Sequence, residues 1–138
     1  KQCQSIPHFP LIDLVVDVEN ELQVTTDKVL LQVALEQLIQ NAITYTTPTS
    51  ASNQVRIYAK VSEDARWMLI KIEDNGIGIE PDMKDRIFEL FFVATERHGA
   101  GIGLYLARTA LERIGSAVLV TRLKKPTVFE IRVPIIQP

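Results

Sequence analysis

Alternation of apolar and polar positions predicts three strands in the first part of the chain. The segment 11–18 is apolar and β-branched with two aspartates on one face, which is typical of a half-buried strand. In 55–61 apolar and polar residues alternate strictly. In 67–74 the apolar residues share one face, and Asp74 is in phase with them. We therefore expect Asp74 to point toward the core at the end of its strand.

Apolar residues at helical spacing predict three helices. The segment 26–45 opens with Thr-Asp, a typical helix start, and Asn41 lies at the margin of its apolar arc. A short helix is expected at 81–90, because proline suits a first helical turn. A third helix is expected to start at 101–103 and to end with Gly115 in the C′ position.

Two more strands, 117–123 and 127–133, complete the pattern. The adjacent strand pairs predict an α/β sandwich, in which a mixed, mostly antiparallel sheet has its helices packed on one face. Residues 93–100 have no clear period and are expected to form a mobile loop. Residues 1–10 carry two prolines and are expected to be the remnant of a preceding segment. A single domain is then expected over 11–138.

Composition narrows the functional classes. The 138 residues suit one domain, and 46% hydrophobic with 23% charged residues excludes disordered, collagen-like and coiled-coil chains. The net charge of −2 makes nucleic acid a poor partner. No apolar run approaches the ~20 residues of a membrane span, so no direct membrane contact is expected. The single cysteine, Cys3, excludes internal disulfides and fits a reducing, cytoplasmic compartment.

Three polar features carry candidate chemistry. They are Asn41, the run Asp-Asn-Gly-Ile-Gly at 74–78, and the glycine-rich run at 99–104 before the third helix. A helix N-terminus leaves free N–H donors, and glycines let phosphate oxygens approach the backbone. Each feature also has a structural interpretation: a helix-packing polar residue, a tight turn and a flexible loop.

The spacing excludes two familiar nucleotide motifs. A dinucleotide fingerprint needs G-x-G-x-x-G directly after a strand, whereas the glycines at 99–103 alternate after an irregular segment. A P-loop needs Gly-Lys followed by Ser or Thr, but Gly103 is followed by Leu104.

Taken in order, the motifs resemble the ATP-binding domain of sensor histidine kinases, the Bergerat fold shared with gyrase, the Hsp90 chaperones and MutL. The resemblance covers 11–134. Residues 35–46 resemble the family's asparagine box, and 74–79 resemble its first glycine box. Residues 87–92 resemble its phenylalanine box, and 99–104 its second glycine box. The resemblance implies a protein histidine kinase of a two-component phosphorelay.

The resemblance also implies roles at the nucleotide. Asn41 would offer its amide oxygen to a Mg²⁺ that bridges the ATP phosphates. Gln37 stands where the family often has a second asparagine at the metal. Asp74 would accept a hydrogen bond from the adenine amino group, which guanine lacks at that position. Gly76 and Gly78 would let the backbone pass close to the base.

Residues 93–100 would form a lid over the phosphates, and the last two glycines of the second glycine box would supply backbone donors. Phe88, Phe91 and Phe92 would anchor the lid's first end and are also typical core aromatics. The residues expected to bind the nucleotide are Gln37, Asn41, Tyr45, Asp74, Gly76, Gly78, Ile79, Phe92, Arg97, Gly99, Gly101, Ile102, Gly103 and Leu104, with Asn41 as the catalytic residue and with Asn41 and Gln37 at the metal.

Several positions depart from the family's pattern. Thr44 stands where a basic residue is usual, which removes a phosphate partner. Glu96 stands where short lids often carry lysine, and Ala100 replaces a hydroxyl residue. Arg97, together with Arg86, is the candidate for compensating the lost positive charge.

The expected phospho-acceptor, a histidine followed by an acid on a dimerising helix, is missing. His8 is followed by Phe-Pro, and proline is excluded from a helix interior. His98 falls in the lid. The expected partners are therefore a helical dimerisation and phospho-acceptor segment of the same protein and a downstream response regulator. Two alternatives stay open: a non-catalytic, ATP-responsive module, and a serine kinase of the same fold like the anti-sigma factors.

Overall fold

The structure is a computed structural model that describes residues 12–18, 25–46, 53–92 and 102–135. Within these ranges one five-stranded sheet has the strand order β1-β2-β3-β5-β4. The strands are β1 (Ile12–Val18), β2 (Asn53–Val61), β3 (Trp67–Asp74), β4 (Ala117–Arg122) and β5 (Thr127–Pro134).

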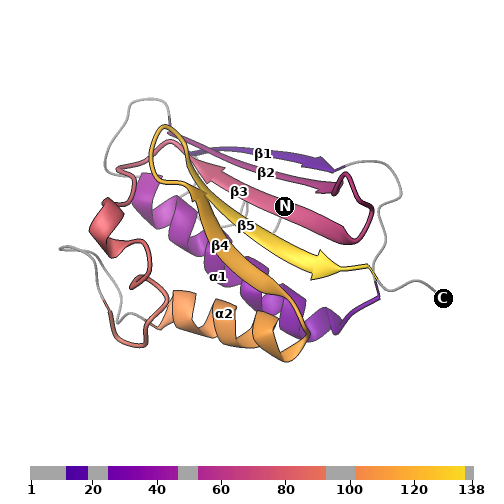
Figure 1. The fold of residues 1–138 in the computed structure, drawn as a ribbon. Coiled ribbons are helices and arrows are strands. Elements are labelled where there is room, and N and C mark those ends of the chain that lie inside the picture. The colour runs from indigo at the N-terminus through magenta and orange to yellow at the C-terminus, as the bar shows by residue number, and fades with distance from the viewer. Residues whose placement is uncertain (1–11, 19–24, 47–52, 93–101, 136–138) are drawn as a thin grey trace.

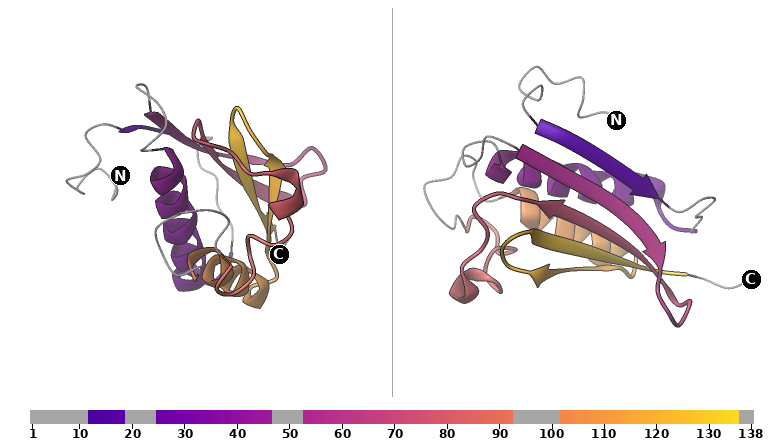
Figure 2. Two further views of the ribbon diagram at one scale, coloured as in Figure 1. Left: turned by 90° about the vertical axis from the view of Figure 1, so that its left-hand side faces the viewer. Right: turned by 90° about the horizontal axis from the view of Figure 1, so that it is seen from above.

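Strands β1 and β2 run parallel, and the other neighbouring strands run antiparallel. The helices α1 (Lys28–Thr46) and α2 (Gly103–Arg113) lie side by side on one face of the sheet (Figures 1 and 2). The predicted mixed, mostly antiparallel sheet with helices on one face is confirmed. No helix in the described ranges is long and apolar enough to cross a lipid bilayer.

The core lies between the helices and the inner face of the sheet. Burial alternates strictly along β3, and the buried residues are those that the sequence pattern placed on one face, Asp74 included. Ile72 is fully buried between Ile57 of β2 and Phe129 of β5. The helices contribute small and branched residues to this core, namely Ala34, Leu38, Ala42 and Ile43 from α1 and Ala107, Ala110 and Leu111 from α2.

Helix α1 begins, and helix α2 ends, where the sequence predicts. The Asp27 carboxylate accepts a hydrogen bond from the Leu30 backbone N–H at 3.0 Å, so it caps the start of α1. Gly115 has φ +73° and donates its N–H to the Glu112 carbonyl at 3.2 Å. The backbone N–H of Ser116 reaches back to the carbonyl of Leu111 at 2.8 Å. These two bonds make a Schellman motif, which needs a left-handed residue at Gly115.

The prediction of a helix at 81–90 is wrong. Only the 3₁₀ helix η2 (Pro81–Met83) forms, and turns follow it. A segment this short gains little from an α-helical ladder, and its stability comes from tertiary packing. The turns place both Ile87 and Phe88 in the core, with the Phe88 ring edge-on to Phe129 at a centroid distance of 6.0 Å.

The phenylalanine box is only partly a core element. Phe88 is 6% exposed and Phe92 is half-buried, whereas Phe91 is 66% exposed. Phe91 has φ +66°, a left-handed backbone conformation at the end of the last turn. The expectation of three core aromatics is therefore correct for Phe88 and wrong for Phe91.

Candidate functional site

The described parts of the four motifs gather at one end of the molecule, which we call the motif end. The C-terminal end of α1, the end of β3, the 3₁₀ helix η2 and the first turn of α2 all lie there, together with the β4–β5 turn (Figures 1 and 2). Segments that are far apart in the sequence thus meet at one end of the strands.

Asp74 is the last residue of β3 and is 1% exposed. Its backbone pairs with Val55 of β2 on one side and Thr127 of β5 on the other, and both are buried. One carboxylate oxygen, Oδ1, accepts the backbone N–H of Gly76 at 3.0 Å. A carboxylate is therefore held at the inner face of the sheet, directly before the first glycine loop, residues 75–80.

Asn75 fixes the start of the first glycine loop. Its side-chain oxygen accepts the Gln54 backbone N–H at 2.9 Å, and its own N–H donates to the Gln54 carbonyl at 3.3 Å. The two bonds continue the β2–β3 ladder beyond Asp74. The position from which the loop leaves the sheet is set by this pair.

The β4–β5 turn fixes the end of the same loop. Gly78 has φ +81°, and a Cβ there would overlap the Lys124 side chain and lie 3.0 Å from the Leu123 carbonyl oxygen. The Ile79 N–H donates to that carbonyl at 2.9 Å, and Ile79 itself is 5% exposed. Glycine is required at Gly78 both by its backbone conformation and by the turn packed against it.

The first turn of α2 approaches α1 at Gln37. An added Cβ at Gly103 would lie 2.8 Å from the Gln37 side-chain oxygen, so these two predicted site residues are brought together. Asn41 follows one helical turn later and shares this face of α1. Its side-chain nitrogen is buried and has no hydrogen-bond partner among the described residues. Tyr45 lies in the last turn of α1, and its side chain is outside the described atoms.

The donor set fits a magnesium ion held chiefly by phosphates. The described ranges contain no group of three or more His, Cys, Asp or Glu residues that could hold a metal ion. Asn41 and Gln37 offer neutral amide oxygens, and rotating the Asn41 amide would exchange its unsatisfied nitrogen for oxygen. Mg²⁺ commonly takes only one or two protein ligands and completes its shell with water and substrate phosphates.

The remaining described site residues flank the segment 93–101. Phe92 precedes it, and the guanidinium carbon of Arg86 lies 4.5 Å from the centre of its ring. Ile102 follows it, is 38% exposed, and accepts the first hydrogen bond of α2 from the Leu106 N–H. Leu104 packs against the core. The predicted residues Arg97, Gly99 and Gly101, the departures Glu96 and Ala100, and both histidines, His8 and His98, lie outside the described residues.

Thr44 contributes no cation near the end of α1. Its hydroxyl donates to the Gln40 carbonyl one turn back at 2.9 Å. The side chain is thus engaged within the helix at the position where the family pattern has a basic residue.

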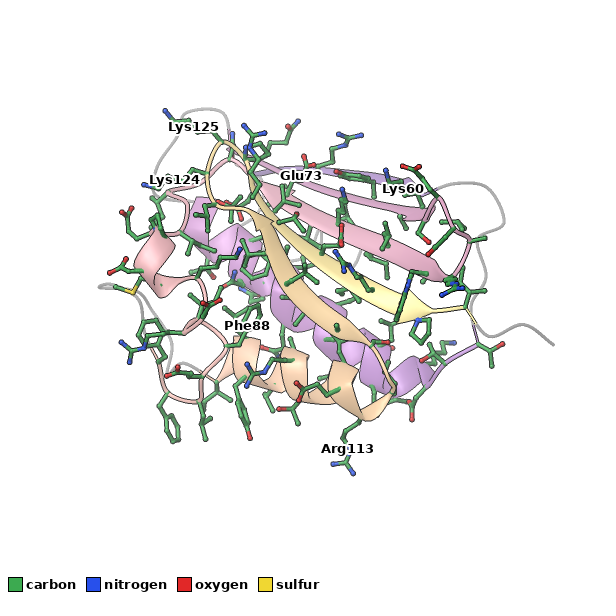
Figure 3. All side chains as sticks on the ribbon, in the orientation of Figure 1. Lys60, Glu73, Phe88, Arg113, Lys124 and Lys125 are labelled. Carbon is green, nitrogen blue, oxygen red and sulfur yellow. The ribbon has the colours of Figure 1, made fainter. Side chains whose placement is uncertain are left out.

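The outer face of the sheet carries a separate polar network, which includes Glu73 (labelled in Figure 3). The Tyr58 hydroxyl donates to Glu73 at 2.6 Å. Burial of the phenol, and to a lesser extent this hydrogen bond, raises the pKa of Tyr58 to about 12. The buried Glu130 pairs with Lys71 at 3.6 Å and with Arg132 at 2.7 Å. None of these residues belongs to the predicted site.

A hollow of about 520 Å³ lies on this outer face near the β2–β3 hairpin, away from the motif end. It is lined by residues of β2, β3, β5 and the β2–β3 hairpin, among them Lys60, Trp67 and Arg132. Asp74 ends β3 at the opposite end of the strand from Trp67. The hollow is therefore not formed by the motifs.

Sequence reasoning missed two neighbours of the site. Thr127 is 1% exposed beside Asp74, and its hydroxyl donates to the Leu123 carbonyl at 3.2 Å. Lys124 lies against Gly78. Only the pairing register of β3 with β5 could have pointed to Thr127, and no local pattern signals Lys124.

A family model described as "Histidine kinase-, DNA gyrase B-, and HSP90-like ATPase" matches residues 26–137. The two-component sensor PprA of Pseudomonas aeruginosa is 31% identical over 111 residues, which are 75% of this chain and 12% of that protein. The swarming motility regulation sensor protein RssA of Serratia marcescens is 32% identical over 113 residues, 80% of this chain and 23% of that protein. The chain thus spans less than a quarter of the length of these curated relatives.

Solved structures share the fold. The catalytic domain of histidine kinase ThkA, in a nucleotide-free form, has a TM-score of 0.75 and 26% identity, covering 89% of this chain and 80% of that one. Full-length ShkA in complex with AMPPNP has a TM-score of 0.76 and 26% identity, covering 92% of this chain and 26% of that one. ThkA in complex with the response regulator protein TrrA has a TM-score of 0.72 at 23% identity, covering 91% and 34%, and shows the fold alone.

Proposed function

The chain belongs to the family of histidine kinase-, DNA gyrase B- and HSP90-like ATPases, and on this premise we propose that it is the catalytic domain of a two-component sensor histidine kinase. Its fold is that of the histidine kinase catalytic domains, and its nucleotide is ATP. The observation that carries the proposal is the buried Asp74 carboxylate at the end of β3, bonded to Gly76 at the start of a glycine loop.

Asp74 is assigned to the adenine base. A buried carboxylate accepts a hydrogen bond strongly, and the adenine amino group is a donor. Guanine presents a carbonyl oxygen at the same ring position, so two acceptors would face one another and the buried carboxylate would lose its partner. This arrangement supports selection of adenine over guanine. Asn75 and Gly78 support the same assignment, because they hold the loop around the base in place.

Asn41 and Gln37 are assigned to the phosphate end of the nucleotide. Their amide oxygens suit Mg²⁺, which when bound would neutralise charge on the ATP phosphates. Gly103, whose N–H belongs to the unsatisfied first turn of α2, is assigned to the phosphates as a backbone donor. The closeness of Gln37 to Gly103 supports one shared phosphate site.

The proposed reaction is transfer of the γ-phosphoryl group to a histidine on a helical segment outside this chain. The bond between the γ-phosphorus and its bridging oxygen breaks, a bond from phosphorus to an imidazole nitrogen forms, and ADP leaves. The domain contributes positioning and charge neutralisation. ThkA forms a complex with a response regulator protein, which supports such a regulator as the downstream partner here. We assign the domain to the cytoplasm, where ATP is available.

Titration calorimetry tests the nucleotide assignment. We expect ATP and ADP to bind with Kd values from micromolar to millimolar, or ~8 to ~4 kcal/mol, and more tightly with Mg²⁺ than without it. GTP is expected to bind more weakly than ATP. Equal affinities for ATP and GTP would contradict the assignment of Asp74 to the base.

A second candidate is a non-catalytic, ATP-responsive module. The observation that favours it is Thr44, because this residue carries no charge and its hydroxyl is bonded to the Gln40 carbonyl, so residue 44 supplies no cation to the phosphates. The two candidates differ in transfer and not in binding. Phosphoryl transfer in the full-length protein supports the kinase, and ATP binding without transfer supports the module.

A further inference from the structure

The β4–β5 turn contacts the first glycine loop through a backbone carbonyl and a lysine side chain. The Leu123 carbonyl accepts the Ile79 N–H at 2.9 Å and also the Thr127 hydroxyl at 3.2 Å. Thr127 is in turn the β5 neighbour of Asp74. The turn therefore joins the far end of the loop to the strand beside Asp74, and a shift of the turn would move both.

Lys124 adds the side-chain part of this contact. Its Cγ and Cδ occupy the space that a side chain at Gly78 would take, so its aliphatic stem covers the loop backbone. Its Nζ donates to Glu80 at 2.6 Å. Lys124 thus contacts the loop at two residues, Gly78 and Glu80.

The stem carries more of this contact than the charge does. The side chains of Lys124 and Glu80 are 46% and 61% exposed, and ion pairs exposed to this extent contribute little. The stem, in contrast, lies against Gly78, which is buried. Lysine stems commonly cover apolar or backbone surface while the ammonium group stays in water.

We propose that Lys124 is a positioning residue for nucleotide recognition, holding the first glycine loop against the β4–β5 turn so that the loop and Asp74 keep one arrangement around the adenine base. This inference rests on the proposed function, because it takes Asp74 as the residue that reads the base. Lys124 does not touch the base and acts through Gly78 and Glu80.

The test compares ATP with inosine triphosphate, whose base has a carbonyl oxygen in place of the adenine amino group and an N–H in place of the ring nitrogen N1. Lys124→Ala removes stem and charge, and Lys124→Met removes the charge alone. Lys125→Gln is the matched control, because it removes the neighbouring charge of the same turn and keeps an unbranched side chain at φ +53° (Figure 3). Calorimetric Kd values and thermal unfolding midpoints are measured for each variant.

We expect Lys124→Ala to lower the preference for ATP over inosine triphosphate by about five- to tenfold, as when one net hydrogen bond is lost. Lys124→Met should keep most of the preference, and Lys125→Gln all of it. A purely structural role would lower the unfolding midpoint and weaken both nucleotides alike, with the preference unchanged.

An unchanged preference in Lys124→Ala would overturn the inference and leave the proposed function standing. Equal binding of the two nucleotides by the parent chain would contradict the proposed role of Asp74 itself. A larger loss in Lys125→Gln than in Lys124→Ala would place the effect at Lys125 and would also overturn the inference.

Discussion

The side-chain oxygen of Gln37 lies 2.8 Å from the point where Gly103 would carry a Cβ. Because residue 103 has no side chain, the Gln37 side-chain amide can lie against the backbone at the start of α2. Residues of two motifs that are separated by about half of the chain therefore lie close together. The atom in the way belongs to the end of a flexible side chain, so an added methyl would displace the Gln37 amide and leave the helices where they are.

Gly103→Ala is therefore expected to separate stability from function. Alanine is a better helix former than glycine, so the unfolding midpoint should stay the same or rise slightly. The displaced Gln37 amide should weaken binding of ATP with Mg²⁺ more than binding without it. Calorimetry with and without Mg²⁺ measures this. In the double variant with Gln37→Ala the added methyl should have no further effect; an additional loss there would show that the methyl acts directly on the nucleotide.

Asp74→Asn is expected to weaken ATP binding by roughly 1.5–3 kcal/mol, the contribution of a hydrogen bond to a charged group. The asparagine oxygen can still accept the Gly76 N–H, so the loop should keep its conformation. What changes is the second atom, which becomes a donor and can face the donor of adenine. Titration of the variant against ATP measures the effect.

Glu73→Gln is the matched control for this substitution. Glu73 is the preceding residue, and its carboxylate lies on the outer face of the sheet beside Tyr58 (Figure 3). It should leave ATP binding unchanged while altering stability slightly. If Asp74→Asn binds ATP as tightly as the parent chain does, the base does not lie at Asp74.

Asn75→Ala is expected to loosen the start of the first glycine loop. The Gln54 N–H loses its acceptor at 2.9 Å, which should cost about 0.5–1.5 kcal/mol of unfolding free energy. ATP affinity should fall as well, because the loop leaves the sheet from this residue. Asn75→Asp keeps the acceptor oxygen and should retain both properties. Denaturant unfolding and calorimetry on the two variants check this, and equal losses in both would place the role in the Asn75 amide nitrogen instead.

Tyr58 is expected to make stability fall at high pH. Burial and the bond to Glu73 raise its pKa from 10.0 to about 12, so the folded protein favours the neutral phenol. This stabilisation is fully present below pH 10 and is lost as the pH rises toward 12. Ultraviolet titration should show one of the three tyrosines ionising near pH 12, and Tyr58→Phe should remove that component. A titration that is the same in Tyr58→Phe would assign the high pKa to another tyrosine.

Local patterns predicted the elements whose signals are local. Alternation along β3 placed Asp74 on the inner face, and the cap at Asp27 and the glycine at Gly115 marked helix ends. The helix predicted to run from Pro81 does not form as an α-helix. The segment packs instead through Phe88 against Phe129, a contact between residues that are distant in sequence.

The same distinction applies to the candidate site. The motifs predicted which residues belong to the site, whereas the contacts between those residues depend on how distant segments pack together. Lys124 and Glu80 are 44 positions apart, and no local spacing links them. The contact of Gln37 with Gly103 likewise depends on how α1 and α2 pack. The roles of Asn41 and of the other site residues at the nucleotide stay predictions.

The last prediction concerns phosphoryl transfer by the isolated chain. Incubated with radiolabelled ATP, the chain should not label itself on histidine. His8 is followed by Phe-Pro, which excludes a helix interior, and His98 falls in the predicted lid. Acid-labile label on His98 would contradict this. Supplied with the helical segment that carries its acceptor histidine, the domain should label that segment.

The charge at the phosphates sets the expected rate of that transfer. The Thr44 hydroxyl is bonded to the Gln40 carbonyl, so under the proposed function neutralisation would depend on Mg²⁺, on the backbone donors at the start of α2 and on Arg97. Losing one positioned donor at a developing charge costs about 10²–10³ in rate, so transfer should be slow. Thr44→Lys should raise the rate constant, and Thr44→Val, which removes the hydroxyl without adding charge, should not. Equal rates in Thr44→Lys and Thr44→Val would show that a cation at this position does not reach the phosphates.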